Sequence, residues 1–149
     1  MIMKEETKNI SLLANQIQSN QLVYEKLPYE NFEEHIARMI ERLKVLKDLF
    51  IKEIAKIAST ELSTLASEEN TALSSYHKQL LDKYDESISS EEVEGCIALL
   101  IEIEENLLEK YHEFLFQNSP NEITKMILKN QVIEVKRDIH ILKNLYDYA

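Results

Sequence analysis

The chain has 149 residues, of which 44% are hydrophobic and 30% are charged, with 1 Gly and 2 Pro. This composition predicts one globular helical domain, because almost nothing interrupts a helix and the length suffices for a sizeable core. A formal net charge of −10 argues against nucleic acid and anionic lipid as partners, since both need a basic face. No apolar run approaches the roughly 20 residues of a membrane span, so no membrane partner is expected either.

The compartment predicted from the sequence is the cytoplasm. Cys96 is the only cysteine, so no intramolecular disulfide is expected. The first residues lack a basic segment followed by an apolar stretch, so no secretion signal is expected. The acidic charge itself is typical of a solvated surface that favours solubility.

The first half of the chain predicts a helical hairpin, residues 5–58. The first helix ends before Pro28, because the residue before a proline avoids the helical region. Asn31 is the predicted cap of the second helix, which runs to about Ala58. The apolar stripe of the first helix consists of Ile10, Leu13, Ile17 and Tyr24, with the polar Asn20 among them. Lys47 lies in the middle of the stripe of the second helix.

Residues 59–90 are rich in Ser, Thr and Glu and predict a long crossover segment. An additional helix is expected within it, from about Glu68 to Asp85, with Leu73, Tyr76 and Leu80 buried. This segment connects the first hairpin to a second one, residues 91–147.

The third helix, about 91–117, carries the clearest apolar face and an acid within it. At 100° per residue one face collects Val93, Ile97, Leu100, Ile103, Leu107, Tyr111 and Phe114. Glu104 falls inside that face, where an unsatisfied carboxylate is costly to bury.

The fourth helix is predicted from Pro120 to about Asp147, with Ser119 as its N-cap. Two apolar rows run along it: Ile123, Ile127, Ile141 and Leu145 in one, and Leu128, Val135 and Leu142 in the other. Gln131, Glu134 and Asp138 lie between the rows. A helix with two apolar rows contacts two neighbours, as in a four-helix bundle.

The two hairpins match weakly when the chain is shifted on itself by 87 residues without gaps. Ile10 then falls on Ile97, Tyr24 on Tyr111, and Ile36 on Ile123. The shift also places Ile17 opposite Glu104 and Lys47 opposite Glu134, so the acids of the second hairpin have no acidic counterparts in the first.

Three stretches carry a family resemblance: EENLLEKYHEFL (Glu104–Leu115), QVIEVKRDIHILKNL (Gln131–Leu145) and LLANQIQSNQLVYEKL (Leu12–Leu27). They resemble a bacterial ferritin-like family, domain of unknown function 2383. The resemblance covers about residues 12–145 and implies an all-α, ferritin-like four-helix bundle of two hairpins joined by a crossover with an additional helix. The family has no established activity to carry over. The chain departs from it in lacking the tryptophan often found in the crossover, where Tyr76 lies.

A ferritin-like fold raises the question of a metal site. Di-iron bundles use one Glu from each of two helices and a Glu-x-x-His pair from each of the other two. Here the acids Glu104, Glu134 and Asp138 come from one hairpin. The single Glu-x-x-His, Glu109 to His112, points away from the apolar face. No cofactor is predicted.

Internal pairing is the preferred explanation of the polar core. Lys47 is expected to pair with Glu104 or Glu134. Tyr24 and Tyr111 are expected to donate to those carboxylates or to Asn20. Cys96 is expected to be a small core residue.

The sequence thus favours a single helical-bundle domain, residues 1–149, with a non-enzymatic structural or protein-interaction role, acting as a homodimer through a bundle face or with a protein partner. The alternative is a carboxylate-rich protein that binds an iron-type metal through Glu104, Glu134, Asp138 and a histidine.

Overall fold

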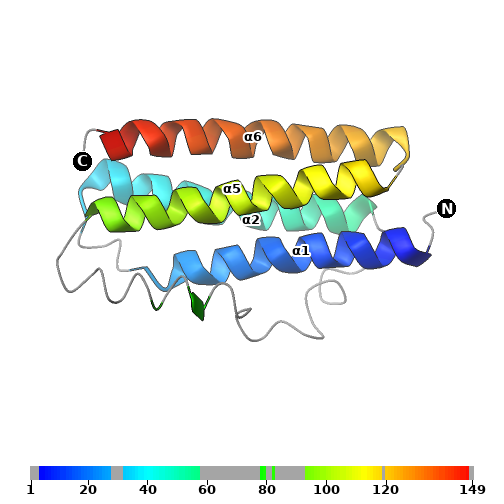
Figure 1. Ribbon diagram of the computed structural model, residues 1–149, viewed down its shortest axis with the longest axis horizontal. Helices are drawn as coiled ribbons and strands as arrows, with labels where there is room; N and C mark the ends of the chain where they lie inside the picture. Colours follow the sequence, from blue (N-terminus) through cyan, green and yellow to red (C-terminus); the bar gives the residue numbers. More distant parts are fainter. Residues whose placement is uncertain are drawn as a thin grey trace.

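Four helices form the architecture of the computed structural model (Figure 1). They are α1 (Lys4–Glu25), α2 (Glu34–Ile57), α5 (Val93–Gln117) and α6 (Glu122–Asp147). The structure describes residues 4–27, 32–57, 78–79, 82, 93–118 and 120–147, with side chains from Asn9 onward. The predicted crossover helix with Leu73, Tyr76 and Leu80 lies outside this set, as do the predicted caps Asn31 and Ser119.

The helices form two hairpins packed side by side. α1 packs on α2 and α6 packs on α5, and the hairpins meet where α1 contacts α5 and α2 contacts α6. In Figure 1, α1 and α6 run in one direction while α2 and α5 run in the other. The end of α2 and the start of α5 therefore lie at opposite ends of the bundle. The all-α four-helix bundle expected from the sequence is confirmed for the described residues.

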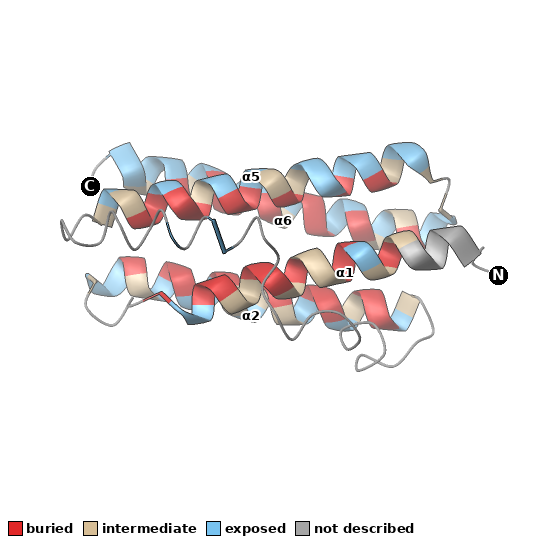
Figure 2. Ribbon diagram, turned by 60° about the horizontal axis from the view of Figure 1, so that its bottom comes forward, coloured by how far each residue is buried: buried red, intermediate tan, exposed pale blue. Residues whose placement is uncertain are grey.

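Each helix turns one apolar stripe toward the bundle axis, as the burial pattern in Figure 2 shows. The stripes of α1, α2 and α5 follow the predicted spacing, and their members Ile17, Ile40 and Leu107 are fully buried. Two apolar clusters result. One surrounds Phe50 and Leu107, and the other surrounds Leu43 and Ile103.

The start of α6 differs from the prediction. Asn121 caps the helix, because its Oδ1 accepts a hydrogen bond from the Thr124 backbone N–H at 2.9 Å. The first helical residue is Glu122, not Pro120. An asparagine side chain that satisfies a free N–H of the first turn is a preferred N-cap.

The buried side of α6 also differs from the prediction. The row of Leu128, Val135 and Leu142 is buried, but Ile123 of the other row is 65% exposed. Ile127, Ile141 and Leu145 of that row are half-buried. The reason is that α6 packs against α5 and α2 through the row that contains Leu128, together with the polar residues Gln131 and Asp138.

Because α6 buries this row, the 87-residue shift no longer matches buried residues of α2 with buried residues of α6. Buried residues of α1 recur in α5 after 87 positions, as Tyr24 and Tyr111 do. Buried residues of α2 recur in α6 after 88 positions, the separation of Ile36 from Thr124 (124 − 36). The counterpart of Lys47 is therefore the apolar Val135 and not Glu134.

Candidate functional site

A polar layer crosses the middle of the bundle, between the two apolar clusters. Each helix contributes one residue to it: Asn20 from α1, Lys47 from α2, Glu104 from α5 and Asp138 from α6. All four are 0% exposed. In helix bundles, cofactor and metal sites are formed by inward-pointing side chains of facing helices. This layer of buried polar side chains is therefore the candidate site.

Glu104 has both carboxylate oxygens engaged. The Lys47 ammonium donates to Oε1 with an Nζ–Oε1 distance of 2.7 Å, and the Tyr24 hydroxyl donates to Oε2 at 2.6 Å. The Lys47 Nζ also lies 5.4 Å from the centre of the Phe50 ring, within the range of a cation–π contact. A buried charge is tolerated when it is paired and hydrogen-bonded, and these contacts satisfy that condition for Glu104.

Asp138 is held by an arginine at the edge of the bundle. The Arg42 Nε donates to Oδ1 at 3.2 Å, and its Nη2 reaches Glu134 at 3.1 Å. The Asp138 Oδ2 has no hydrogen-bond partner among the described residues. Burial raises the pKa of the Asp138 carboxyl above its ordinary value, although the Arg42 hydrogen bond and the charges of Lys47 and Arg42 oppose that shift.

Tyr111 takes part in a second polar contact, next to the layer. Its hydroxyl donates to the Gln131 Oε1 at 2.5 Å. The Gln131 Nε2 in turn lies 3.3 Å from the Phe50 carbonyl oxygen and 3.2 Å from the Glu53 Oε1. Burial, with the nearby negative charges of Glu104 and Glu53, raises the pKa of Tyr111 well above its ordinary value. The phenol therefore remains a hydrogen-bond donor at neutral pH.

These contacts separate the predicted polar residues into two groups. Lys47, Glu104 and Tyr24 are brought together, and of the two partners considered for Lys47 the structure selects Glu104. Glu134 is instead half-buried, with ion pairs to Arg42 and, at 3.3 Å, to Arg137. The expected contact of Tyr111 with a carboxylate or with Asn20 is replaced by the Gln131 amide.

Sequence reasoning missed the role of Arg42. The signal was present, because Arg42 adjoins the core residue Leu43, while Glu134 and Asp138 are spaced four residues apart on α6. Residues at that spacing share a helix face, and two carboxylates on one face favour a bridging arginine. The antiparallel packing of α2 and α6 that joins them was not readable from the sequence.

The predicted metal ligands are not assembled among the described residues. No group of three or more His, Cys, Asp and Glu side chains within the described ranges lies close enough to share an ion. Glu109 and His112 are both exposed on α5, and His35 and His140 are also exposed. Where a metal bundle places a cation against its core carboxylates, this bundle places the Lys47 ammonium against Glu104.

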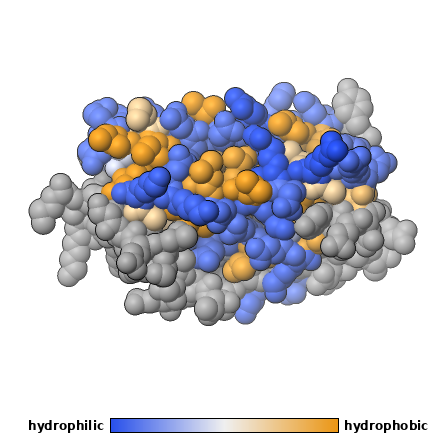
Figure 3. Space-filling model, turned by 180° about the vertical axis from the view of Figure 1, so that it is seen from behind, coloured by the Kyte–Doolittle hydropathy of each residue, from blue (hydrophilic) through white to orange (hydrophobic). Residues whose placement is uncertain are grey.

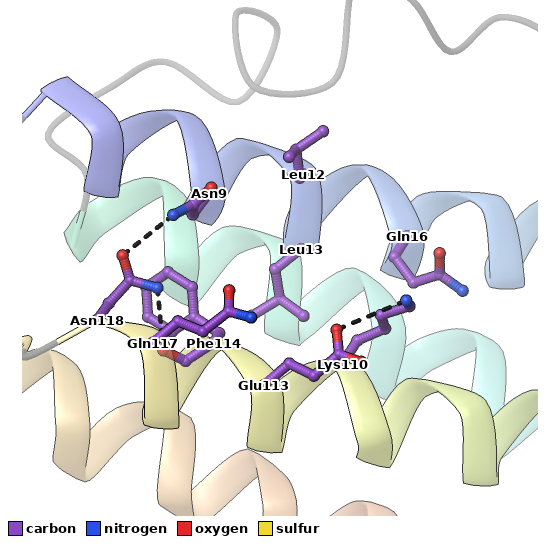
Figure 4. Close-up of a pocket in the computed structure, with 9 residues that line it drawn as sticks. All are labelled: Asn9, Leu12, Leu13, Gln16, Lys110, Glu113, Phe114, Gln117 and Asn118. Carbon is purple, nitrogen blue, oxygen red and sulfur yellow. Dashed lines mark hydrogen bonds and ion pairs between the residues drawn. The ribbon is translucent and has the colours of Figure 1, made fainter.

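Two surface depressions accompany the buried layer. A groove of about 290 Å³ lies between α1 and α5 (Figure 4). It is rich in amides, and a 3.1 Å hydrogen bond from Asn9 to Asn118 spans it. The second, of about 490 Å³, lies between α2 and α6 and includes Leu49 and Ile133. Neither groove is lined by Lys47 or Glu104.

Comparisons with known proteins return no match, whether to family models, to curated proteins or to solved structures. Within the described part of the chain, no helix combines the length and apolarity needed to cross a membrane.

Proposed function

We propose that this chain is a ferritin-like four-helix bundle with a non-enzymatic structural or protein-interaction role, acting through its surface. The helix directions support the ferritin-like part, because α1 and α2 form one hairpin, α5 and α6 form the other, and a long connection joins parallel helices. The sequence resemblance supports the same assignment.

One observation carries the functional part of the proposal. Both oxygens of Glu104, a fully buried acid in a fold that often holds metal, are already bonded to Lys47 and Tyr24. A carboxylate engaged in this way fixes the register of the helices around it, which is the best-attested use of a buried polar contact. The buried polar residues therefore stabilise the arrangement of the helices, and we propose that contacts with other molecules are made by the surface.

The distribution of exposed apolar side chains supports a contact surface. Large exposed apolar residues concentrate on α2 and α6: Val45, Leu49, Ile123, Met126, Ile133 and Tyr146. Figure 3 shows apolar side chains gathered in the middle of the molecule's rear side, which includes α2, with hydrophilic side chains around them. Contiguous apolar surface of this kind marks sites of protein association.

Site-specific photo-crosslinking in living cells tests the interaction role. A photoreactive residue at position 49 is compared with one at position 12, because Leu49 on α2 and Leu12 on α1 have similar exposure, 49% and 53%. The proposal predicts a covalent adduct of defined mass from position 49 and none from position 12. Absence of any adduct from position 49 would contradict it.

A further inference from the structure

We propose that the exposed side of α2 and α6, the α2/α6 face, is the interface of a homodimer in which α2 of one copy packs antiparallel against α2 of the other. This inference rests on the proposed interaction role and names its partner, a second copy of this chain. The face is centred on Leu49 of α2 and Ile133 of α6, which are 49% and 55% exposed.

A stripe of α2 is complementary to itself in the antiparallel direction. Arg42, Leu46, Leu49 and Glu53 follow one another at spacings of four, three and four residues and all line the α2/α6 groove. Such spacing keeps side chains on one helix face. When a second copy runs the opposite way, Arg42 meets Glu53 of the second copy at both ends, and Leu46 meets Leu49 of the second copy in the middle.

The contact between Arg42 and Glu53 occurs twice in such a dimer, because an isologous interface repeats every contact about its twofold axis. The residue numbers 42 and 53 have the same sum as 46 and 49, so the charged pair and the apolar pair agree on one antiparallel register.

α6 adds apolar surface at the same level of the bundle. Ile133 lies level with the middle of α2, because its neighbours Gln131 and Glu134 bond to the Phe50 carbonyl and to Arg42. In a twofold dimer centred on Leu46 and Leu49, Ile133 approaches Ile133 of the second copy. The apolar middle of the interface then spans both helices.

The size and charge of the face suit a second copy. α2 has 24 residues and is about 36 Å long, and two adjacent helices are about 20 Å wide, so the face approaches the roughly 800 Å² that each partner buries in a stable complex. The charged residues that line the groove are two arginines, Arg42 and Arg137, and two glutamates, Glu53 and Glu134. This balance lets two chains of net charge −10 meet where their repulsion is least, whereas a basic partner would favour an acidic surface.

Sedimentation equilibrium of the purified full chain tests the dimer. We expect the mass of two chains for the native protein and for the matched control Leu12→Asp, and the mass of one chain for Leu49→Asp and, independently, for Ile133→Asp. All three altered residues are about half-exposed, and a circular dichroism melt verifies that each variant is folded. A native chain that stays monomeric at every concentration, or Leu12→Asp and Leu49→Asp behaving alike, would overturn the inference.

A charge exchange tests the antiparallel register. Arg42→Glu and Glu53→Arg should each weaken dimerisation about tenfold in variants that circular dichroism shows to be folded, because each places like charges opposite each other twice in the dimer. The double variant should restore the native dissociation constant. Within one chain these residues are three turns apart, so a restoration reports contact between copies. Failure of the double variant to recover would overturn the antiparallel arrangement.

The two proposals fail in different ways. A monomeric chain whose position 49 crosslinks to a different protein would overturn the homodimer and leave the interaction role standing. A monomeric chain with no adduct at position 49 would overturn both.

Discussion

Lys47 and Glu104 reach each other across the diagonal of the bundle. Their side chains meet at an Nζ–Oε1 distance of 2.7 Å, although α2 and α5 do not pack directly against each other. The contact therefore joins the two hairpins through the centre of the core. An ammonium and a carboxylate buried together in this way specify which helix levels face each other.

Tyr24→Phe should lower the free energy of unfolding by about 1.5–3 kcal/mol, because it leaves the Glu104 Oε2 without its donor and a hydrogen bond to a charged group is worth about that much. Tyr111→Phe is the matched control, since Tyr111 is equally buried but donates to the neutral Gln131 amide. Its cost should be nearer 1 kcal/mol. Urea unfolding measures both, and a larger loss for Tyr111→Phe would contradict the assignment of Glu104 as the charged acceptor.

Asp138→Asn should gain stability relative to the native chain as the pH rises. The folded protein raises the pKa of this carboxyl, so between its ordinary value of about 3.9 and the raised value the folded state holds a proton that the unfolded chain has released. Native stability contributed by this group is therefore complete below that window and is lost as the pH rises through it. The asparagine has no such loss and can still accept the Arg42 hydrogen bond.

Urea unfolding across the acidic to neutral range measures this difference. Glu134→Gln is the control, because it removes the other carboxylate that contacts Arg42 from a half-exposed position. If Asp138→Asn became progressively less stable than the native chain as the pH rose, the Asp138 carboxyl would be stabilised as an anion, against this account.

Asn121→Ala should cost about 1 kcal/mol, the usual effect of losing an N-cap side chain. The physical reason is that the Thr124 N–H loses its 2.9 Å acceptor at the start of α6. Ser119→Ala is the informative comparison, since Ser119 is the cap that the sequence predicts. A thermal melt in which Ser119→Ala is the more damaging variant would favour the sequence assignment instead.

The sequence predicted the four described helices well and the polar layer in part. Glu104 stood out because a carboxylate interrupted an otherwise continuous apolar face, and Lys47 stood out in the same way on α2. These irregularities are visible because three of the four helices have one clean stripe each.

α6 could not be read so directly. Its sequence offers two apolar rows, and only packing against α2 and α5 selects Leu128, Val135 and Leu142 over Ile123 and its row. The turns of the two hairpins differ in length by one residue. In the first hairpin the first buried residue after the turn is Ile36, 12 positions after Tyr24. In the second hairpin it is Thr124, 13 positions after Tyr111. A gapless alignment of the chain on itself cannot detect a difference in turn length.

Metal analysis separates this account from the metal-binding alternative. Protein purified without chelator, with and without added ferrous iron, should contain metal far below one ion per chain, because Glu104 is bonded to Lys47 and Tyr24 and Asp138 to Arg42. Stoichiometric metal in the native chain that disappears in a Glu104→Gln variant would show that Glu104 serves as a ligand.

A double-mutant cycle between Lys47 and Glu104, measured by urea unfolding, tests the central claim most directly. Lys47→Met alone should cost about 3–5 kcal/mol, because it leaves a buried carboxylate without its cation, whereas Lys47→Met combined with Glu104→Leu should recover most of that loss. Lys52→Met, at a lysine 59% exposed on the same helix, should change stability little. If Lys47→Met were as stable as the native chain, or the double variant lost the sum of both single effects, the pairing of Lys47 with Glu104 would not hold this core together.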